Sequence, residues 1–239
     1  MRIGVIIPSA NTVAEGELRE IFSSAVGLHF TRLALNGSST EDLEQMTDGL
    51  ESAISLLADA KVDIIIFHCT AVSTFSDQME ISLQDRAKNI SKSIPFITTA
   101  TAMVHMLKQL QVQRIALVTP YIEEITRREI TYLSARNISV LSHHSDGIAS
   151  PHQMAAVTSE YWAEKIVQHA SPALDGYLLS CNGIRSLNEL EALEARLGKP
   201  VITSNTALAH YCFSELESTD VSCCIAQKIN LPKSLLSIN

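Results

Sequence analysis

The sequence predicts an α/β protein made of two pseudo-symmetric halves, each a four-stranded parallel sheet flanked by helices, with a cleft between the halves. Short runs rich in Val and Ile alternate with longer stretches of helical period, as in parallel strands joined by crossover helices. The strand-like runs form two groups of four, and segments of the first group recur in the second. Two copies of one unit therefore account for most of the chain.

Eight segments have the length and composition of buried strands. In chain order they are Arg2–Ile7, Leu28–Leu33, Ile64–Phe67, Phe96–Thr98, Arg114–Val118, Ser139–His143, Gly176–Leu179 and Val201–Thr203. The stretches between them are expected to be helices, including one from about Thr99 to Leu110. Another, residues 40–60, carries apolar side chains three or four positions apart, which predicts one helix face packed on the core: Leu43, Met46, Leu50, Ile54 and Leu57.

Three pairs of segments reveal the duplication. IGVIIPSA at 3–10 resembles IALVTPYI at 115–122, and VDIIIFHCTAVS at 62–73 resembles LDGYLLSCNGIR at 174–185. PFITTATAM at 95–103 resembles PVITSNTAL at 200–208. We therefore expect a first half at 1–98, completed by a helix at 205–217, and a second half at 99–204. The tail at 218–239 has no counterpart in the first half, and its Cys223 and Cys224 are expected to take no part in function.

Composition excludes several classes of protein. The 239 residues include 18 basic and 26 acidic side chains, a net charge of −8, and no basic cluster, so a nucleic-acid partner is not expected. The apolar runs are far shorter than the roughly 20 residues of a membrane span. Five cysteines, an odd number in a chain too large to need disulfides, favour reduced thiols and a cytoplasmic location.

Two cysteines occupy matching positions in the two halves. Cys69 in HCTA and Cys181 in SCNG each follow a buried strand, 112 residues apart. The carboxyl ends of parallel strands form ligand sites, so the two thiols are expected on opposite walls of the cleft. The start of the next helix favours a thiolate there, and also a substrate carboxylate. One thiol could add to a double bond while the other transfers a proton, or both could exchange protons with one carbon.

No cofactor or metal is expected. The sequence has no GxGxxG, GxxxxGK[ST] or HExxH motif. His143, His144 and Asp146 form the most metal-like group, but adjacent side chains on a strand point in different directions. For the same reason, His68 is interpreted as a packed histidine on the side of the strand opposite to Cys69.

Six segments in this order resemble the aspartate/glutamate racemase superfamily, in particular its branch of maleate isomerases, arylmalonate decarboxylases and ectoine-utilisation proteins. They are IGVIIPSANT, CTAVS, TPYIEE, SDGI, LLSCNGIRSL and GKPVITSNTALA. The resemblance spans about residues 2–216. It implies two Rossmann-like halves, a site between them, a cofactor-independent reaction on a small carboxylate, and a homodimer or homotetramer.

The same resemblance implies roles for individual residues. Cys69 matches a nucleophile or base, and Cys181 a proton donor. Asn11 matches a carboxylate-binding asparagine and Tyr121 a tyrosine whose hydroxyl reaches the substrate. Further substrate contacts are expected from side chains or backbone N–H groups of Ser9, Thr70, Ala71, Asn182 and Gly183, and from Arg185, which could equally be a surface arginine.

Several functions stay open on the sequence. Cis–trans isomerisation of a maleate-like enoate is favoured because PSANT and TPY resemble that branch. Racemisation of an Asp- or Glu-type amino acid or a hydantoin, decarboxylation of an arylmalonate, and carboxylate binding without catalysis are the alternatives. Cys69 replaces a glycine of the decarboxylases, which argues against decarboxylation. Residues 149–151 read Ala-Ser-Pro where maleate isomerases have a further asparagine, which argues against maleate itself.

Overall fold

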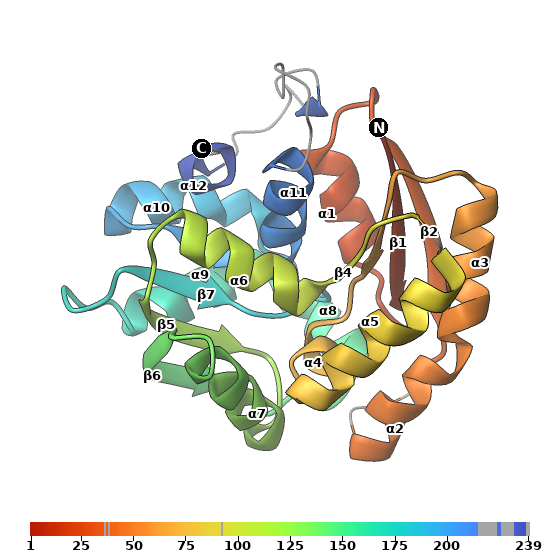
Figure 1. Cartoon of the computed structure of the whole chain (residues 1–239). Coiled ribbons are helices and arrows are strands. Elements are labelled where there is room, and N and C mark those ends of the chain that lie inside the picture. Colours follow the sequence, from red (N-terminus) through yellow and green to blue (C-terminus); the bar gives the residue numbers. More distant parts are fainter. Residues whose placement is uncertain (36, 38, 92, 215–223, 226–231, 238–239) are drawn as a thin grey trace.

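The computed structural model describes residues 1–35, 37, 39–91, 93–214, 224–225 and 232–237. It confirms the predicted α/β architecture (Figure 1). The two four-stranded sheets share one strand order. The strands agree with the predicted ranges to within two residues at each end. The duplication read from the repeated segments is therefore a duplication of fold.

The first sheet has the order β2-β1-β3-β4, and all of its neighbours are parallel. Its strands are β1 (Arg2–Pro8), β2 (Gly27–Leu33), β3 (Ile64–Phe67) and β4 (Phe96–Thr98). The central strands β1 and β3 are almost wholly buried, as expected of strands covered by helices on both faces. Their carboxyl ends therefore lie side by side.

The second sheet has the equivalent order β6-β5-β7-β8 and is also parallel. Its strands are β5 (Arg114–Thr119), β6 (Ser139–Ser145), β7 (Gly176–Leu179) and β8 (Val201–Thr203). Strand β5 corresponds to β1 and β7 to β3. The segments after β3 and β7, which carry the two cysteines, are thus equivalent by position.

Helices connect the strands. Before β5 they are α1 (Ala14–Ile21), α2 (Thr40–Gln45), α3 (Leu50–Asp59), α4 (Thr70–Ser73), α5 (Asp77–Ser91) and α6 (Thr99–Gln109). They are followed by α7 (Glu123–Ser134), α8 (Pro151–Ala156), α9 (Ser159–Gln168), α10 (Leu190–Leu197), α11 (Ser204–Ser214) and α12 (Lys233–Leu236). Local signals set several boundaries: the Thr98 hydroxyl accepts from Thr101 N–H at the start of α6, and Gly198 ends α10 at φ +64°.

The stretch 40–60 is not one helix. A 3₁₀ turn at Met46–Gly49 separates α2 from α3. Gly49 packs so closely on β2 that a Cβ there would lie 2.9 Å from Leu33 Cδ2. The five apolar residues predicted to form one helix face, Leu43, Met46, Leu50, Ile54 and Leu57, are nevertheless all buried, because the turn keeps them on the same side of the segment. The periodicity correctly predicted burial and missed the break.

Helices α6 and α11 pack against each other between the two sheets (Figure 1). Helix α6 is the helix predicted from about Thr99 to Leu110; it follows β4 of the first sheet and precedes β5 of the second. Helix α11 also contacts α1 of the first half. Residues 215–217 of the helix predicted at 205–217 lie outside the described residues. The boundaries of the two halves stay predictions.

Parts of the tail pack on the body of the protein. Ile225 forms an isolated antiparallel bridge with Phe22, and Ser23 N–H donates to the Cys224 carbonyl at 2.8 Å. Helix α12 contacts α11. Cys224 is buried away from the cysteines that follow β3 and β7, whereas Cys223 lies outside the described residues.

Within the described ranges, every helix is too short or too polar to cross a bilayer.

Candidate active site

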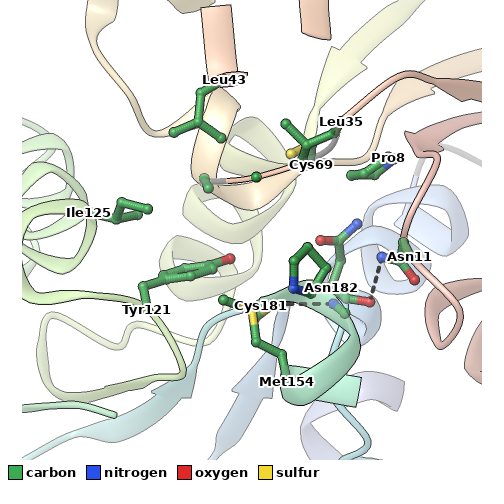
Figure 2. A pocket seen from close by; sticks show the side chains of 14 residues that line it. Pro8, Asn11, Leu35, Leu43, Cys69, Tyr121, Ile125, Met154, Cys181 and Asn182 are labelled. Atoms are coloured by element: carbon green, nitrogen blue, oxygen red, sulfur yellow. Dashed lines mark hydrogen bonds between the residues drawn. The ribbon is translucent and has the colours of Figure 1, made fainter. Parts of the chain in front are cut away.

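A cavity opens at the carboxyl ends of β1, β3, β5 and β7, where the two halves face each other. It encloses about 530 Å³ of empty space, part of it open to solvent. Parallel sheets place ligand sites at these ends, so the position agrees with the predicted cleft. The cavity is lined by Pro8, Asn11, Leu35, Gly37, Leu43, Cys69, Ala71, Tyr121, Ile125, Pro151, Met154, Cys181, Asn182 and Gly183 (Figure 2).

Cys69 lies at the N-cap of the one-turn helix α4, in extended conformation with φ −144° and ψ 105°. Burial raises the pKa of its thiol to about 12, and hydrogen bonds from the backbone N–H groups of Val72 and Ala71 only partly oppose this. The nearby Cys181 raises the pKa further. The expectation that this position favours a thiolate is wrong for the protein without substrate, because loss of hydration outweighs the backbone donors.

Cys181 has a different set of donors. Gly183 N–H donates to its sulfur at 3.2 Å, and the Tyr121 hydroxyl forms a second hydrogen bond with it. Burial nevertheless raises the pKa of the Cys181 thiol to about 11. Both thiols that line the cavity are therefore protonated at neutral pH. The described lining contains no Lys, Arg or His side chain that would lower the pKa of either thiol.

Two asparagines hold the ends of β1 and β7 together. Asn11 Oδ1 accepts from the N–H groups of Val13 (3.0 Å) and Ala14 (2.9 Å) at the start of α1. Its Nδ2 donates to the Asn182 carbonyl at 3.1 Å, across the boundary between the halves. Asn182 Nδ2 in turn donates to the His68 carbonyl at 2.5 Å. The amides therefore fix the two cysteine segments relative to each other.

Tyr121 completes the polar surface of the cavity. It follows β5 at the position equivalent to Ser9 after β1, and it is 4% exposed. Burial raises the pKa of its hydroxyl well above the ordinary value, and the neighbouring Cys181 adds to the shift. The phenol thus keeps its proton and acts as a donor throughout the neutral range.

Three residues predicted to bind substrate lie outside the cavity lining. Thr70 is fully buried and its hydroxyl donates to Ser204 Oγ at 2.9 Å. The Ser9 hydroxyl accepts from Leu35 N–H at 3.1 Å. Arg185 lines a separate surface hollow, and its Nε donates to the Ala155 carbonyl at 3.1 Å. The other predicted residues, Asn11, Ala71, Tyr121, Asn182 and Gly183, are brought together with both cysteines.

His68 is a packed histidine, as predicted. Its Nδ1 lies 3.0 Å from Thr99 Oγ1 and its Nε2 lies 2.8 Å from Asn205 Oδ1, with the ring fully buried. Burial lowers its pKa to about 4, so the ring is neutral. In the described part of the chain, no group of three or more His, Cys, Asp or Glu residues could hold a metal ion.

Two buried carboxyl groups behind the cavity were not singled out from the sequence. Glu17 accepts from Ser186 N–H (2.6 Å), Leu187 N–H (3.0 Å) and Asn205 Nδ2 (2.6 Å), which ties α1 to the segment after Cys181. Glu129 on α7 is fully buried and accepts from the Ser180 hydroxyl. Burial raises the pKa of Glu129 to about 8. Neither residue has a sequence signal, because both lie on ordinary amphipathic helices.

The cavity also has apolar walls, and of their residues only Leu43 was named from the sequence, as part of a helix face packed on the core. Leu43 belongs to the apolar helix face predicted within residues 40–60, and Ile125 and Met154 come from α7 and α8. A helical apolar stripe cannot distinguish a side chain packed on the core from one facing a cavity. The polar residues of the site therefore had a sequence signal and its apolar residues did not.

Comparison with known proteins identifies relatives with this architecture. The family model for arylmalonate decarboxylase matches residues 3–226. Maleate isomerase from Alcaligenes faecalis is 25% identical over 217 residues, which cover 85% of this chain and 86% of that protein. Two solved structures share the fold at 23% identity each. The maleate isomerase Iso from Pseudomonas putida S16 with maleate has a TM-score of 0.86 and covers 95% of this chain and 99% of its own. Maleate cis-trans isomerase from Nocardia farcinica, with a covalently bound succinylcysteine intermediate, has a TM-score of 0.83. This match covers 90% of the present chain and 92% of the other chain.

Proposed function

Because the chain belongs to the arylmalonate decarboxylase family, we propose that it is a cofactor-independent cis–trans isomerase of a maleate-like enoate that uses Cys69 and Cys181. The single observation that carries the proposal is that two thiols from equivalent positions of the two halves line one cavity. The cavity contains hydrogen-bond donors suited to one carboxylate. The curated relatives named maleate isomerase support the same reaction class.

In the proposed reaction, Cys69 first loses its proton to water. Its sulfur then forms a bond to one alkene carbon while the π electrons move to the other carbon as an enolate. Cys181 gives its proton to that carbon, leaving a thioether with a single carbon–carbon bond that can rotate. After rotation, the Cys181 thiolate takes the proton back, the C–S bond breaks and the trans alkene forms. The Cys69 thiolate released by this cleavage takes a proton from water, so both cysteines end as thiols.

The surrounding residues have positioning and binding roles in this proposal. Asn11 and Asn182 bind one substrate carboxylate at the junction of the two halves, and Gly183 lines the cavity beside them with its N–H donated to Cys181 Sγ. The Tyr121 hydroxyl, already hydrogen-bonded to Cys181, stabilises the thiolate that Cys181 becomes when it gives up its proton. Ala71 lines the cavity beside Cys69. Ser9 and Arg185 have structural roles in this proposal, each bonded to neighbouring backbone, and Thr70 has one through its bond to Ser204 Oγ.

A decarboxylase is the second candidate, because the matching family model carries that description. In that reaction a carboxylate leaves as carbon dioxide and Cys181 protonates the carbanion that remains. Cys69 would then be dispensable. The two functions thus differ in their need for the Cys69 sulfur.

Proton NMR in deuterated buffer separates these reactions. Isomerisation of maleate or a related cis acid converts cis vinylic signals to trans signals, whereas decarboxylation releases carbon dioxide, and racemisation exchanges an α-proton of aspartate or glutamate for deuterium. We expect Cys69→Ala to abolish isomerisation and Cys181→Ser to accumulate an adduct on the Cys69 peptide, detected by mass spectrometry. Cys212→Ala, which removes a buried thiol outside the cavity lining, is the control. Carbon dioxide release that survives Cys69→Ala would instead establish the decarboxylase.

We further infer a cytoplasmic homo-oligomer. No disulfide joins the described cysteines, which fits a reducing compartment. A dimer or tetramer follows from the family resemblance, and light scattering on the purified protein tests it; a monomer at micromolar concentration contradicts it.

A further inference from the structure

The buried carboxyl groups of Glu17 and Glu129 are equivalent by position in the two halves. Glu17 lies on α1, which follows β1, and Glu129 lies on α7, which follows β5. The two residues are 112 positions apart, the same separation as that of Cys69 and Cys181. Each half of the fold therefore contains one such carboxyl group, and the proposed reaction assigns a step to neither.

In the second half, the carboxyl group is linked directly to the residue before the cysteine. The Ser180 hydroxyl donates to Glu129 Oε1, and Ser180 immediately precedes Cys181. Both Ser180 and Glu129 are completely buried. The residue before Cys181 is thus attached to α7 behind the cavity.

In the first half, one amide lies between the carboxyl group and the equivalent residue. His68 immediately precedes Cys69 and corresponds to Ser180 in the repeat. Glu17 Oε2 accepts from Asn205 Nδ2 at 2.6 Å, and Asn205 Oδ1 lies 2.8 Å from His68 Nε2. We call Glu17, Asn205 and His68 the buried chain. It connects α1 and α11 to the residue before Cys69.

The hydrogen bonds of the buried chain have a defined direction. N–H groups donate to both oxygens of Glu17, as suits an ionised carboxylate, which can only accept. Asn205 therefore turns its Nδ2 toward Glu17 and its Oδ1 toward His68, and Oδ1 requires that His68 Nε2 carry the proton. The ring is neutral, so its Nδ1 accepts from the Thr99 hydroxyl at 3.0 Å. Each polar group of the chain then has a partner.

Glu17 also holds the segment that follows Cys181. Its Oε1 accepts from the N–H groups of Ser186 and Leu187 at 2.6 and 3.0 Å. The residues of the buried chain are at most 8% exposed, and none of them belongs to the described lining of the cavity. The chain therefore joins the segments of both cysteines from behind the cavity, without contact with a bound substrate.

We propose that Glu17 and Asn205 are positioning residues of the isomerase, which hold the Cys69 segment at a fixed position relative to the Cys181 segment. The inference rests on the proposed function and adds two residues to it. In that reaction the Cys69 sulfur bonds to one alkene carbon and Cys181 protonates the neighbouring carbon, so both must reach one substrate at the same time. A misplacement of about 1 Å can cost about 10²-fold in rate. Because the buried chain does not touch the substrate, its loss lowers kcat and leaves KM nearly unchanged.

Three variants test this role. Asn205→Leu removes both hydrogen bonds of the amide at similar volume. The double variant Glu17→Gln/Asn205→Asp reverses the pair, because the new amide at position 17 donates to the new carboxylate at position 205, which still accepts from His68 Nε2. Thr206→Val is the matched control, since it removes a buried hydroxyl of the same helix whose hydrogen bonds are with Thr203.

The kinetic constants for cis–trans conversion are compared in variants that circular dichroism shows to be folded. We expect Asn205→Leu to lower kcat at least about tenfold, with KM within about twofold of wild type. The double variant is expected to recover kcat to within about threefold of wild type, and Thr206→Val to keep it within about twofold. A folded Asn205→Leu protein with the kcat of Thr206→Val overturns the proposal, as does a double variant no more active than Asn205→Leu.

The tautomer of His68 gives a measurement on the wild-type protein that needs no substrate. After sequential assignment, nitrogen-15 NMR of the histidine ring shows which nitrogen carries the proton. We expect a protonated Nε2 and an unprotonated Nδ1 at neutral pH. A proton on Nδ1 instead means that Glu17 does not orient Asn205, and it overturns the role of Glu17.

Failure of this inference is distinguishable from failure of the proposed function. If the wild-type protein isomerises no cis acid, the isomerase function is wrong and the positioning role is wrong with it. If the wild-type protein is active and Asn205→Leu matches Thr206→Val, the isomerase function stands and the positioning role alone is wrong.

Discussion

Ionisation of Cys69 is the step that the structure makes most costly. Cys69 is 3% exposed, and burial raises the pKa of its thiol from about 9 to about 12. The difference corresponds to about 4 kcal/mol of additional free energy for forming the thiolate. At pH 8 only about one molecule in 10⁴ carries the thiolate, so we predict that reactivity at Cys69 keeps rising far above neutral pH.

Alkylation by iodoacetamide between pH 7 and pH 10 measures this directly. The rate constant at Cys69, followed by mass spectrometry of its peptide, is expected to rise about tenfold for each pH unit without levelling off. The slope is the informative quantity, because restricted access to the cavity lowers every point by the same factor. A short peptide containing one cysteine is the control and levels off near pH 8.5.

A plateau at Cys69 below pH 9 refutes the reasoning. It would mean that the backbone donors Ala71 and Val72 stabilise the thiolate more than burial destabilises it. Cys181→Ala gives a further check, because the neighbouring thiol raises the pKa of Cys69 and its removal is expected to shift the curve toward lower pH.

Three further predictions concern other residues. Cys69→Ala is expected to lower kcat by at least about 10³-fold and Cys181→Ser by about 10²- to 10⁴-fold, measured as cis–trans conversion under saturating substrate; a smaller loss in either variant removes that thiol from the mechanism. The carboxyl of Glu129 has a folded-state pKa of about 8, above the unfolded value, so its contribution to stability is complete below about pH 4 and is lost as pH rises toward 8. The Glu129→Gln side chain does not titrate, so we expect its free energy of unfolding in urea to rise relative to wild type by up to about 5 kcal/mol between pH 4 and pH 8.5. A difference in unfolding free energy that is independent of pH contradicts this. Glu17→Gln places an amide against donors such as Ser186 N–H, and a loss of about 1–3 kcal/mol in the free energy of unfolding is expected at pH 7; an unchanged urea midpoint would show that the buried contacts of Glu17 contribute little.

The strands and the cysteine positions were predictable because both depend on local pattern. Buried parallel strands need short apolar runs, and repeated segments at offsets of 112, 112 and 105 residues placed Cys69 and Cys181 at equivalent strand ends. The predicted bounds of Ile64–Phe67 and Gly176–Leu179 match β3 and β7. A break such as the turn at Met46–Gly49 left the periodicity intact and was therefore missed.

The remaining details of the site depend on partners far apart in the sequence. Thr70 was predicted to meet substrate, but its hydroxyl is held by Ser204, 134 residues away. The polarity of the cavity depends on Leu43 and Ile125, whose positions match those of core residues on any amphipathic helix. Burial of the two thiols, which raises their pKa values, also depends on residues of both halves that are far apart in the sequence.

The two thiols differ in a way that matches their proposed roles. The Cys181 sulfur accepts hydrogen bonds from the Tyr121 hydroxyl and from Gly183 N–H, whereas the donors at Cys69 are the backbone N–H groups of Ala71 and Val72. A proton donor works better when its conjugate base is stabilised, so a side-chain donor of this kind suits the role proposed for Cys181. In the proposed reaction, Tyr121, which follows β5 and has Ser9 as its counterpart after β1, therefore favours Cys181 as the acid and leaves Cys69 to form the carbon–sulfur bond.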